Sequence, residues 1–141
     1  MAGARRMDDS TSMPQPAVPL KVFLADDSAL IRSRVSAILA ARSATVVGQA
    51  ETPQGCIDGI LAARPDVVVL DVQLDGGQGL EVLRAVRPVA PDIAFVVFSN
   101  NAGPAYRKRY LGAGAARFLD KSAEFDQLPA AVESARQPVS L

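Results

Sequence analysis

The sequence predicts an α/β fold, in which a sheet of five parallel strands carries helices on both faces. Five short apolar runs recur every 21 to 26 residues, beginning near Leu20, Thr45, Asp66, Asp92 and Ala116. This spacing fits one strand followed by one crossover helix. The third and fourth runs, Val67–Leu70 and Ile93–Phe98, are almost wholly apolar, as expected for strands covered on both faces.

Two helices are predicted between the first three strands. The first, at about 28–42, has apolar residues at helical spacing and Ser28 near its N-terminal cap. The second, at about 53–64, begins with Thr52 before Pro53, a favourable pair of cap and first-turn residues. Pro65 ends this helix, because proline cannot continue the hydrogen-bond ladder. The apolar stripe of the first helix consists of Ile31, Val35, Ile38 and Leu39.

Three further helices are predicted from breaker residues in the second half of the chain. The third, at about 80–86, ends before Pro88. The fourth, at about 104–111, ends at glycines that include Gly112. The fifth covers about 125–136.

One domain is predicted at 20–137, with a C-terminal tail at 138–141, because 141 residues suffice for a single ordinary core. Residues 1–19 are rich in Ala, Ser, Asp, Gln and Pro, so we expect a disordered N-terminal tail. Met7 and Met13 are alternative start residues. No second domain is expected.

The composition excludes several classes of function. The formal net charge is zero, so no electrostatic case for direct nucleic-acid binding arises. No apolar run approaches the roughly 20 residues that span a bilayer, so no membrane association is expected. The single cysteine, Cys56, forms no internal disulfide and suits a reduced cytoplasm. The chain has no histidine, so any phosphohistidine must come from another protein.

Polar residues follow four of the apolar runs: the pair Asp26 and Asp27, then Asp71, Ser99 and Lys121. In a five-stranded sheet of order 2-1-3-4-5, the first and third strands flank the crevice where ligands bind. Three carboxylates there would repel one another unless a hard cation such as Mg²⁺ neutralised them. Asp71 would then suit nucleophilic attack on phosphorus, with Lys121 and Ser99 contacting the transferred group.

Each of these residues also has a simpler interpretation. The acidic pair suits a solvated loop, Ser99 suits a turn, and Lys121 suits an exposed surface. The basic cluster Tyr106–Tyr110 fits a solvated helix face better than a nucleic-acid contact. The glycines within 75–79 lack the lysine and hydroxyl of a phosphate-binding loop and are interpreted as loop geometry.

From about Leu20 to Arg136, the sequence resembles the receiver domain of bacterial two-component response regulators. The resemblance includes Gly79, eight residues after Asp71, and Phe118, three residues before Lys121. It implies the flavodoxin-like receiver fold, and a stand-alone, single-domain type similar to chemotaxis regulators. It also implies a cytoplasmic phosphorelay protein without independent turnover.

The resemblance implies a phosphoacceptor role for Asp71, with a sensor histidine kinase or histidine phosphotransfer protein as donor. Mg²⁺ would be held by Asp26, Asp27, Asp71 and the backbone carbonyl of Gln73. Ser99 would move toward the phosphoryl group while Phe118 turned inward, which would change the surface of the fourth helix, fifth strand and fifth helix. The residues expected near this output face are Tyr106, Arg107 and Tyr110. The downstream protein target is unknown, and the protein would be a monomer or a phosphorylation-linked dimer.

Five positions modify what this resemblance implies. Ser122 follows Lys121 where many receivers have a proline after a cis peptide, so this bond is either trans or strained. Asn100 is larger than the usual Ala or Gly and is expected to slow uptake from small donors. Gln73 and Asn101 are expected to position a hydrolytic water. Leu30 lies off the apolar stripe of the first helix and is expected to help dock the kinase.

Other functions are less well supported. An aspartate-nucleophile phosphohydrolase needs an acid two residues after the nucleophile, where this chain has Gln73. A pseudo-receiver would not need the complete set of acidic, hydroxyl and lysine groups. A DNA-binding regulator needs a second domain or a basic reading element. A flavin carrier needs a phosphate-binding loop where Asp26 and Asp27 would repel phosphate.

Overall fold

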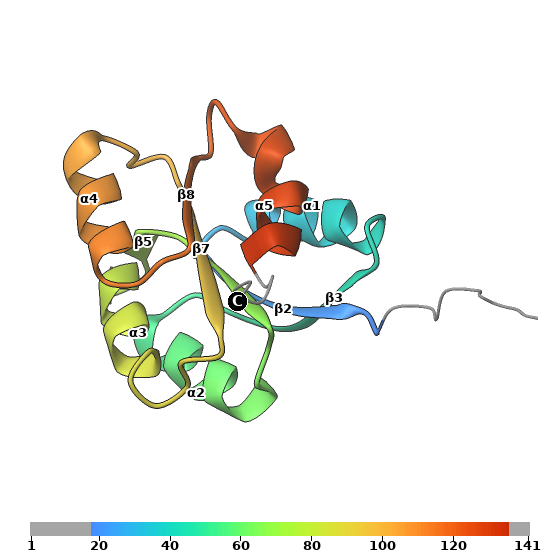
Figure 1. Cartoon of the computed structure of the whole chain (residues 1–141), viewed down its shortest axis with the longest axis horizontal. Helices are drawn as coiled ribbons and strands as arrows, with labels where there is room; N and C mark the ends of the chain where they lie inside the picture. Colours follow the sequence, from blue (N-terminus) through green and yellow to red (C-terminus); the bar gives the residue numbers. More distant parts are fainter. Residues whose placement is uncertain (1–17, 136–141) are drawn as a thin grey trace, which may run out of the picture.

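The five predicted strands form one parallel sheet, with the order β3-β2-β4-β7-β8 (Figure 1). The computed structural model describes residues 18–135. The strands are β2 (Leu20–Ala25), β3 (Ala44–Ala50), β4 (Val67–Leu70), β7 (Ala94–Ser99) and β8 (Arg117–Asp120). This is the predicted order 2-1-3-4-5. The strand order reverses at β2, because β3 lies on one side of β2 and β4 lies on the other.

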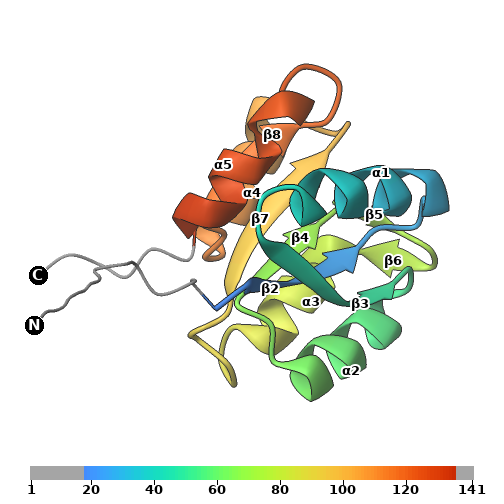
Figure 2. The same cartoon turned by 90° about the vertical axis from the view of Figure 1, so that its right-hand side faces the viewer.

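Helices cover both faces of the sheet (Figures 1 and 2). They are α1 (Ala29–Ala40), α2 (Pro53–Ala63), α3 (Gly79–Val86), α4 (Pro104–Gly112), η1 (Phe125–Gln127) and α5 (Leu128–Ala135). Helices α1 and α5 pack on one face, where Val35, Leu39 and Val132 meet Leu24 and Val69 of the strands. Phe125 of η1 packs on this face too, whereas α2, α3 and α4 pack on the opposite face, which contains the remaining apolar cluster. Alternate residues of each strand enter the two clusters, as the pleat requires.

The predicted helix starts are confirmed by their hydrogen bonds. Ser28 Oγ accepts from the backbone N–H of Ile31 at 3.2 Å, and Thr52 Oγ1 accepts from the N–H of Gly55 at 3.0 Å. These bonds satisfy N–H groups that have no partner within the first helical turn. At the end of α2, Arg64 takes a left-handed conformation with φ of 51° and directs the chain into Pro65.

The segment expected to form a single fifth helix divides into η1 and α5. Pro129 has no backbone N–H, so a continuous α-helix from Phe125 would lack its bond to the Phe125 carbonyl. Instead, the N–H of Leu128 donates to the Phe125 carbonyl across a 3₁₀ turn. The regular helix therefore begins at Leu128.

A short hairpin follows β4 where the sequence indicated only a loop. Its strands, β5 (Gln73–Leu74) and β6 (Gly77–Gln78), pair in antiparallel fashion. Gly76 makes the turn possible with φ of +83°, a conformation that other residues adopt at a cost. The hairpin brings the chain back beneath Asp71 and into α3.

Several expectations concern residues outside or at the edges of the described part. The tails expected at 1–19 and 138–141 lie outside residues 18–135, apart from Val18 and Pro19. Within 18–135 every peptide bond is trans, so the bond between Lys121 and Ser122 needs no cis conformation. No helix in this range is long and apolar enough to cross a membrane.

Candidate functional site

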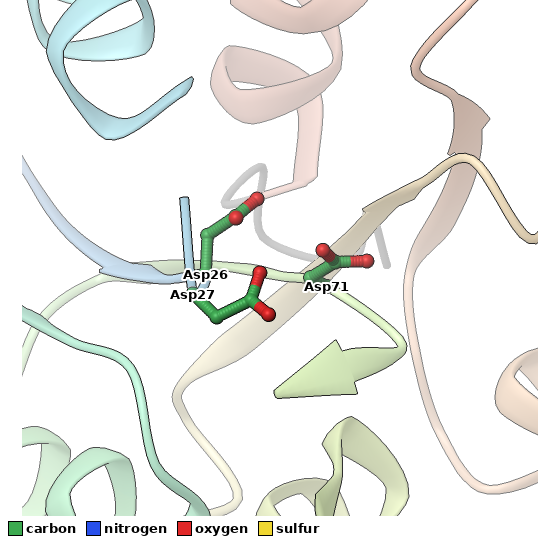
Figure 3. Close-up of side chains that lie close together, drawn as sticks. All are labelled: Asp26, Asp27 and Asp71. Atoms are coloured by element: carbon green, nitrogen blue, oxygen red, sulfur yellow. The ribbon is translucent and has the colours of Figure 1, made fainter. Parts of the chain in front are cut away.

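The register of the sheet brings three carboxylates to one edge. Ala25 of β2 pairs with Leu70 of β4, so Asp26 and Asp71 leave the sheet at matched positions. The backbone N–H of Asp71 donates to the Ala25 carbonyl at 2.9 Å and fixes this alignment. With Asp27, they can offer oxygen atoms that all lie within 4.8 Å of one another (Figure 3).

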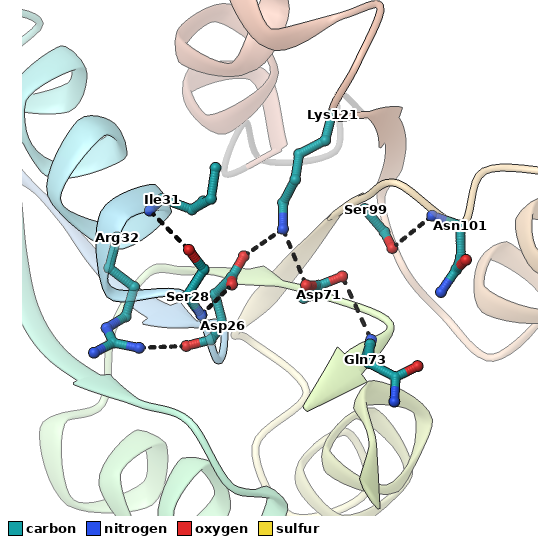
Figure 4. A network of polar contacts seen from close by, with 9 residues as sticks. All are labelled: Asp26, Ser28, Ile31, Arg32, Asp71, Gln73, Ser99, Asn101 and Lys121. Atoms are coloured by element: carbon teal, nitrogen blue, oxygen red, sulfur yellow. Dashed lines mark hydrogen bonds and ion pairs between the residues drawn. The ribbon is translucent and has the colours of Figure 1, made fainter. Parts of the chain in front are cut away.

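Lys121 lies between two of these carboxylates (Figure 4). Its Nζ is 2.7 Å from Asp26 Oδ2 and 3.0 Å from Asp71 Oδ2, and all three side chains are buried. Burial alone would lower the pKa of Lys121, but the bonds and charges of the two carboxylates outweigh it and raise the pKa. The lysine is therefore a fixed cation, and the simpler interpretation of a solvated surface residue is wrong.

Asp26 is held by its neighbours at the start of α1. Its burial raises the pKa of the carboxyl group, although Lys121 and the N–H of Ser28 oppose this shift. Ser28 N–H donates to Asp26 Oδ1 at 2.9 Å, and Arg32 Nη1 donates to the Asp26 carbonyl at 2.6 Å. Arg32 was not among the predicted site residues. Its position one helical turn after the cap was the only sequence signal for this contact.

Asp71 rests on the backbone of the hairpin and of α3. Its Oδ1 accepts from the Gln73 N–H at 3.4 Å, a long bond. The N–H of Gly79 donates to the Val72 carbonyl at 2.8 Å. A Cβ added to Gly79 would overlap the carbonyl oxygen of Asp71. Glycine at 79 therefore permits the close approach of α3 that supports Asp71.

Ser99 lies at the end of β7 and is bonded to its own turn. Its Oγ is buried and accepts from the Asn101 N–H at 3.0 Å (Figure 4). The simpler interpretation of Ser99 as a turn residue therefore describes its contacts in this conformation. The same strand end holds Lys121, whose backbone N–H donates to the Ser99 carbonyl at 3.0 Å. Asn100 is exposed beside this turn.

Phe118 and Tyr110 are both inside the domain. Phe118 is 5% exposed and meets Tyr110 edge to face, with 6.0 Å between ring centroids. Tyr110 is 1% exposed, and its hydroxyl accepts from the Leu80 N–H at 3.0 Å. Two expectations are corrected here: Tyr110 is not a surface residue, and Phe118 is already turned inward. The two rings fill the space beneath α4, and neither ring is exposed in this conformation.

Of the expected output residues, Tyr106 and Arg107 do reach the surface. Tyr106 is 40% exposed. Arg107 also has a structural role, since its guanidinium donates to the carbonyls of Ala102 and Phe118 and forms an ion pair with Glu124 at 3.2 Å. Leu30, expected to contact the kinase, is 70% exposed on α1.

The carboxylate cluster offers the ligand chemistry that Mg²⁺ prefers. Mg²⁺ takes oxygen ligands and retains several waters. Asp27 is exposed, whereas Asp26 and Asp71 are buried, so the cluster has one side open to solvent. Three anions and one ammonium leave a net negative charge that a divalent cation would offset.

Replacing Asp27 with asparagine is expected to stabilise the metal-free protein, because it removes one of three clustered negative charges. The gain should be about 1 kcal/mol, the energy of two unit charges near 4 Å in a water-like medium. The same change should weaken the stabilisation that Mg²⁺ gives. Urea unfolding with and without MgCl₂ measures both effects. Asp92→Asn, an exposed acid in another loop, is the matched control. An unchanged Mg²⁺ response in Asp27→Asn would exclude this residue as a ligand.

Comparison with known proteins gives a consistent result. The response regulator receiver domain model matches residues 22–133. The response regulator GacA of Pseudomonas aeruginosa is 33% identical over 114 residues, which cover 80% of this chain and 53% of GacA. A signal receiver domain from Mycobacterium tuberculosis superposes with a TM-score of 0.78 at 30% identity, covering 85% of this chain and 98% of that chain.

A second relative is a longer protein that is named as an enzyme. The protein-glutamate methylesterase/protein-glutamine glutaminase of Nocardioides sp. is 30% identical over 121 residues, which cover 84% of this chain and 33% of that enzyme. The chain therefore spans about half the length of GacA and a third of the length of the methylesterase.

Proposed function

Because the chain belongs to the receiver domain family of response regulators, we propose that Asp71 accepts a phosphoryl group from a histidine kinase or a histidine phosphotransfer protein. The observation that carries this proposal is the buried ammonium of Lys121, which bridges Asp71 and Asp26 at 3.0 and 2.7 Å. A buried lysine that contacts the acceptor carboxylate can neutralise a phosphoryl oxygen as charge develops on it. The chain has no histidine, so the donor imidazole must belong to another protein.

The proposed transfer forms one bond and breaks one. An oxygen of the Asp71 carboxylate attacks phosphorus, while the phosphorus–nitrogen bond to the donor imidazole breaks and the imidazole takes up a proton from solvent. The Gln73 N–H already donates to Asp71 Oδ1, which leaves Oδ2 facing Lys121. Lys121 would therefore contact an oxygen of the phosphoryl group beside Asp71.

The residues fit Mg²⁺, which would be held by Asp26, Asp27, Asp71 and the backbone carbonyl of Gln73. When bound, the ion would supply positive charge to the oxygens of the transferring group. Asp26 contributes from a fixed position, because Ser28 and Arg32 hold its carboxylate and its carbonyl.

We propose that Ser99 is the switch residue that senses the phosphoryl group. Its Oγ would exchange the N–H of Asn101 for contact with a phosphoryl oxygen, and this would draw the turn before α4 toward Asp71. Since Phe118 is already buried, the change would pass through the packing of Phe118 against Tyr110 rather than through entry of an exposed ring. The result is a population shift between two arrangements of the α4, β8 and α5 surface, with Tyr106 and Arg107 at its edge.

The neighbours of the site would set the rates. Asn100 would restrict small donors, and Gln73 and Asn101 would position the water that hydrolyses the phosphoryl group. Leu30 is proposed to contact the donor because it is a large apolar side chain exposed on the helix that follows the acidic pair. Output would pass to a protein target, with the chain acting as a monomer or a phosphorylation-linked dimer in the cytoplasm.

Intact-mass spectrometry after incubation with acetyl phosphate and MgCl₂ tests the proposal. One added phosphoryl group is expected, and it should be lost in Asp71→Asn and without MgCl₂. Asp75→Asn is the matched control, because Asp75 is an exposed acid in the same loop region. An adduct that persists in Asp71→Asn would place the acceptor elsewhere. Failure of acetyl phosphate, of a phosphohistidine donor and of beryllofluoride to act on the protein would refute the function.

A further inference from the structure

A second surface of the domain, separate from the carboxylate cluster, has a strong charge of its own. A groove of about 700 Å³ lies between α3 and α4. Four cations line it: Arg84 and Arg87 from the C-terminal end of α3, and Lys108 and Arg109 from α4. Between them the lining is small and apolar and includes Ala105 and Gly112. The chain as a whole has equal numbers of basic and acidic residues, so this concentration is local.

In the part of the chain that the structure describes, none of the four cations forms an ion pair with an acidic residue. Within residues 18–135, the ion pairs of the structure join other residues, such as Arg42 with Glu133 and Arg107 with Glu124. In the same range, no aspartate or glutamate lines the groove. Arg84 and Arg87 are three residues apart and therefore share a helix face, where like charges repel. An anionic partner would relieve this repulsion.

One of the cations is held in place. Arg87 Nη1 donates to the Pro91 carbonyl at 3.3 Å. Its guanidinium also lies against Gly114, where an added Cβ would come within 2.7 Å of Arg87 Nε. Gly114 has φ of +112°, a conformation that favours glycine. The position therefore has no side chain, which leaves room for the guanidinium. A guanidinium fixed in this way loses less freedom when it binds a carboxylate.

The shape and distribution of charge point to one kind of partner. A small anion would need converging, buried donors, whereas Arg84, Lys108 and Arg109 are exposed and come from two different helices. Small residues in the middle of a groove with cations along both sides suit a helix that has an apolar stripe flanked by carboxylates. At Gly112, a Cβ would meet nothing within 4 Å, so the lining is open to a side chain from outside.

We propose that the groove between α3 and α4 binds an acidic amphipathic helix of a partner protein. The partner's carboxylates would pair with Arg84, Arg87, Lys108 and Arg109, and its small apolar residues would pack over Ala105 and Gly112. This surface does not depend on phosphorylation of Asp71, so the inference stands or falls independently of the proposed function.

The test uses the full chain and a defined probe. The probe is a synthetic helical peptide with an alanine and leucine stripe between two rows of glutamates, followed by fluorescence anisotropy and by amide chemical shifts. Saturable binding with shift changes in α3 and α4 is expected. Arg84→Gln combined with Lys108→Gln should weaken binding by about tenfold or more. These two side chains are exposed, so the variant should fold; Arg87 is left intact because it packs on Gly114.

The control removes the same charge from the opposite face of the sheet. Arg42→Gln combined with Arg117→Gln alters residues that contact α5, and it should leave binding within about twofold, since it removes only long-range screened charge. The same peptide with glutamines in place of glutamates should not bind. Three results would overturn the inference: no saturable binding of the glutamate peptide, equal losses in the two double variants, or tighter binding of a single-stranded oligonucleotide of equal charge.

Discussion

Replacing Lys121 with methionine is expected to lower the free energy of unfolding of the metal-free protein by about 3–5 kcal/mol, the usual cost of removing one partner from a buried ion pair. The side chain lies 2.7 Å from Asp26 and 3.0 Å from Asp71, and all three groups are buried. Without the ammonium, two neighbouring carboxylates would lose the cation that satisfies them. Phosphorylation of Asp71 should fall below detection in intact-mass assays, because the Lys121 ammonium would no longer contact the oxygens of the transferring group.

Two further measurements separate this effect from general damage. MgCl₂ should stabilise Lys121→Met more than the unsubstituted protein, because the ion would supply charge that the lysine no longer provides. The pKa of Lys121 is raised by folding, so its stabilising contribution is complete below its unfolded pKa of 10.5 and is lost as pH rises through the folded pKa. Lys21→Met, at an exposed lysine, is the control. Equal stability of Lys121→Met and the control would contradict the assigned role.

Replacing Gly79 with alanine is expected to damage both stability and phosphorylation. The added methyl would overlap the carbonyl oxygen of Asp71 and approach Leu70, so α3 or the Asp71 backbone must shift. Overpacking of this kind costs about 1–3 kcal/mol, occasionally more. A shift of Asp71 would also disturb its contact with Lys121 and slow phosphoryl uptake.

Gly112→Ala is the matched control for Gly79→Ala. Both glycines are helical, but a Cβ at Gly112 meets nothing within 4 Å, so that variant should be neutral or slightly more stable. Urea unfolding and the rate of adduct formation with acetyl phosphate measure the two effects. If Gly79→Ala unfolded and reacted like Gly112→Ala, the support of Asp71 by α3 would not matter.

Much of the fold and site could be predicted because the strongest signals are local. An apolar run that ends in a polar residue marks the end of a strand, and parallel register then places Asp26 and Asp71 at one level. The same rule brings Lys121 to this edge, since β8 is parallel to β7 and β7 is parallel to β4. The position of its ammonium between two carboxylates depends on tertiary packing and cannot be predicted from residue spacing alone.

What could not be predicted depends on contacts with main-chain atoms and on packing. Arg32 and Arg107 donate to carbonyls whose positions arise only when the strands and loops are in place. Tyr106 and Tyr110 are four residues apart and share a helix face, yet the first is 40% exposed and the second 1%. Only the position of α4 over the sheet distinguishes them. Pro129 did carry a usable signal, because its missing N–H marks the change from η1 to α5.

The attachment of α4 has a consequence for how the surface can change over evolutionary time. Tyr110 is the buried residue of this helix, and Arg107 adds bonds to main-chain carbonyls. Tyr110 and Arg107 therefore anchor α4 to the rest of the domain. The other positions of the helix are exposed and make few contacts within the domain, so substitutions there can adapt the surface to a new partner. Diversification of signalling specificity would accordingly concentrate on α4, while the sheet and the carboxylate cluster stay constant.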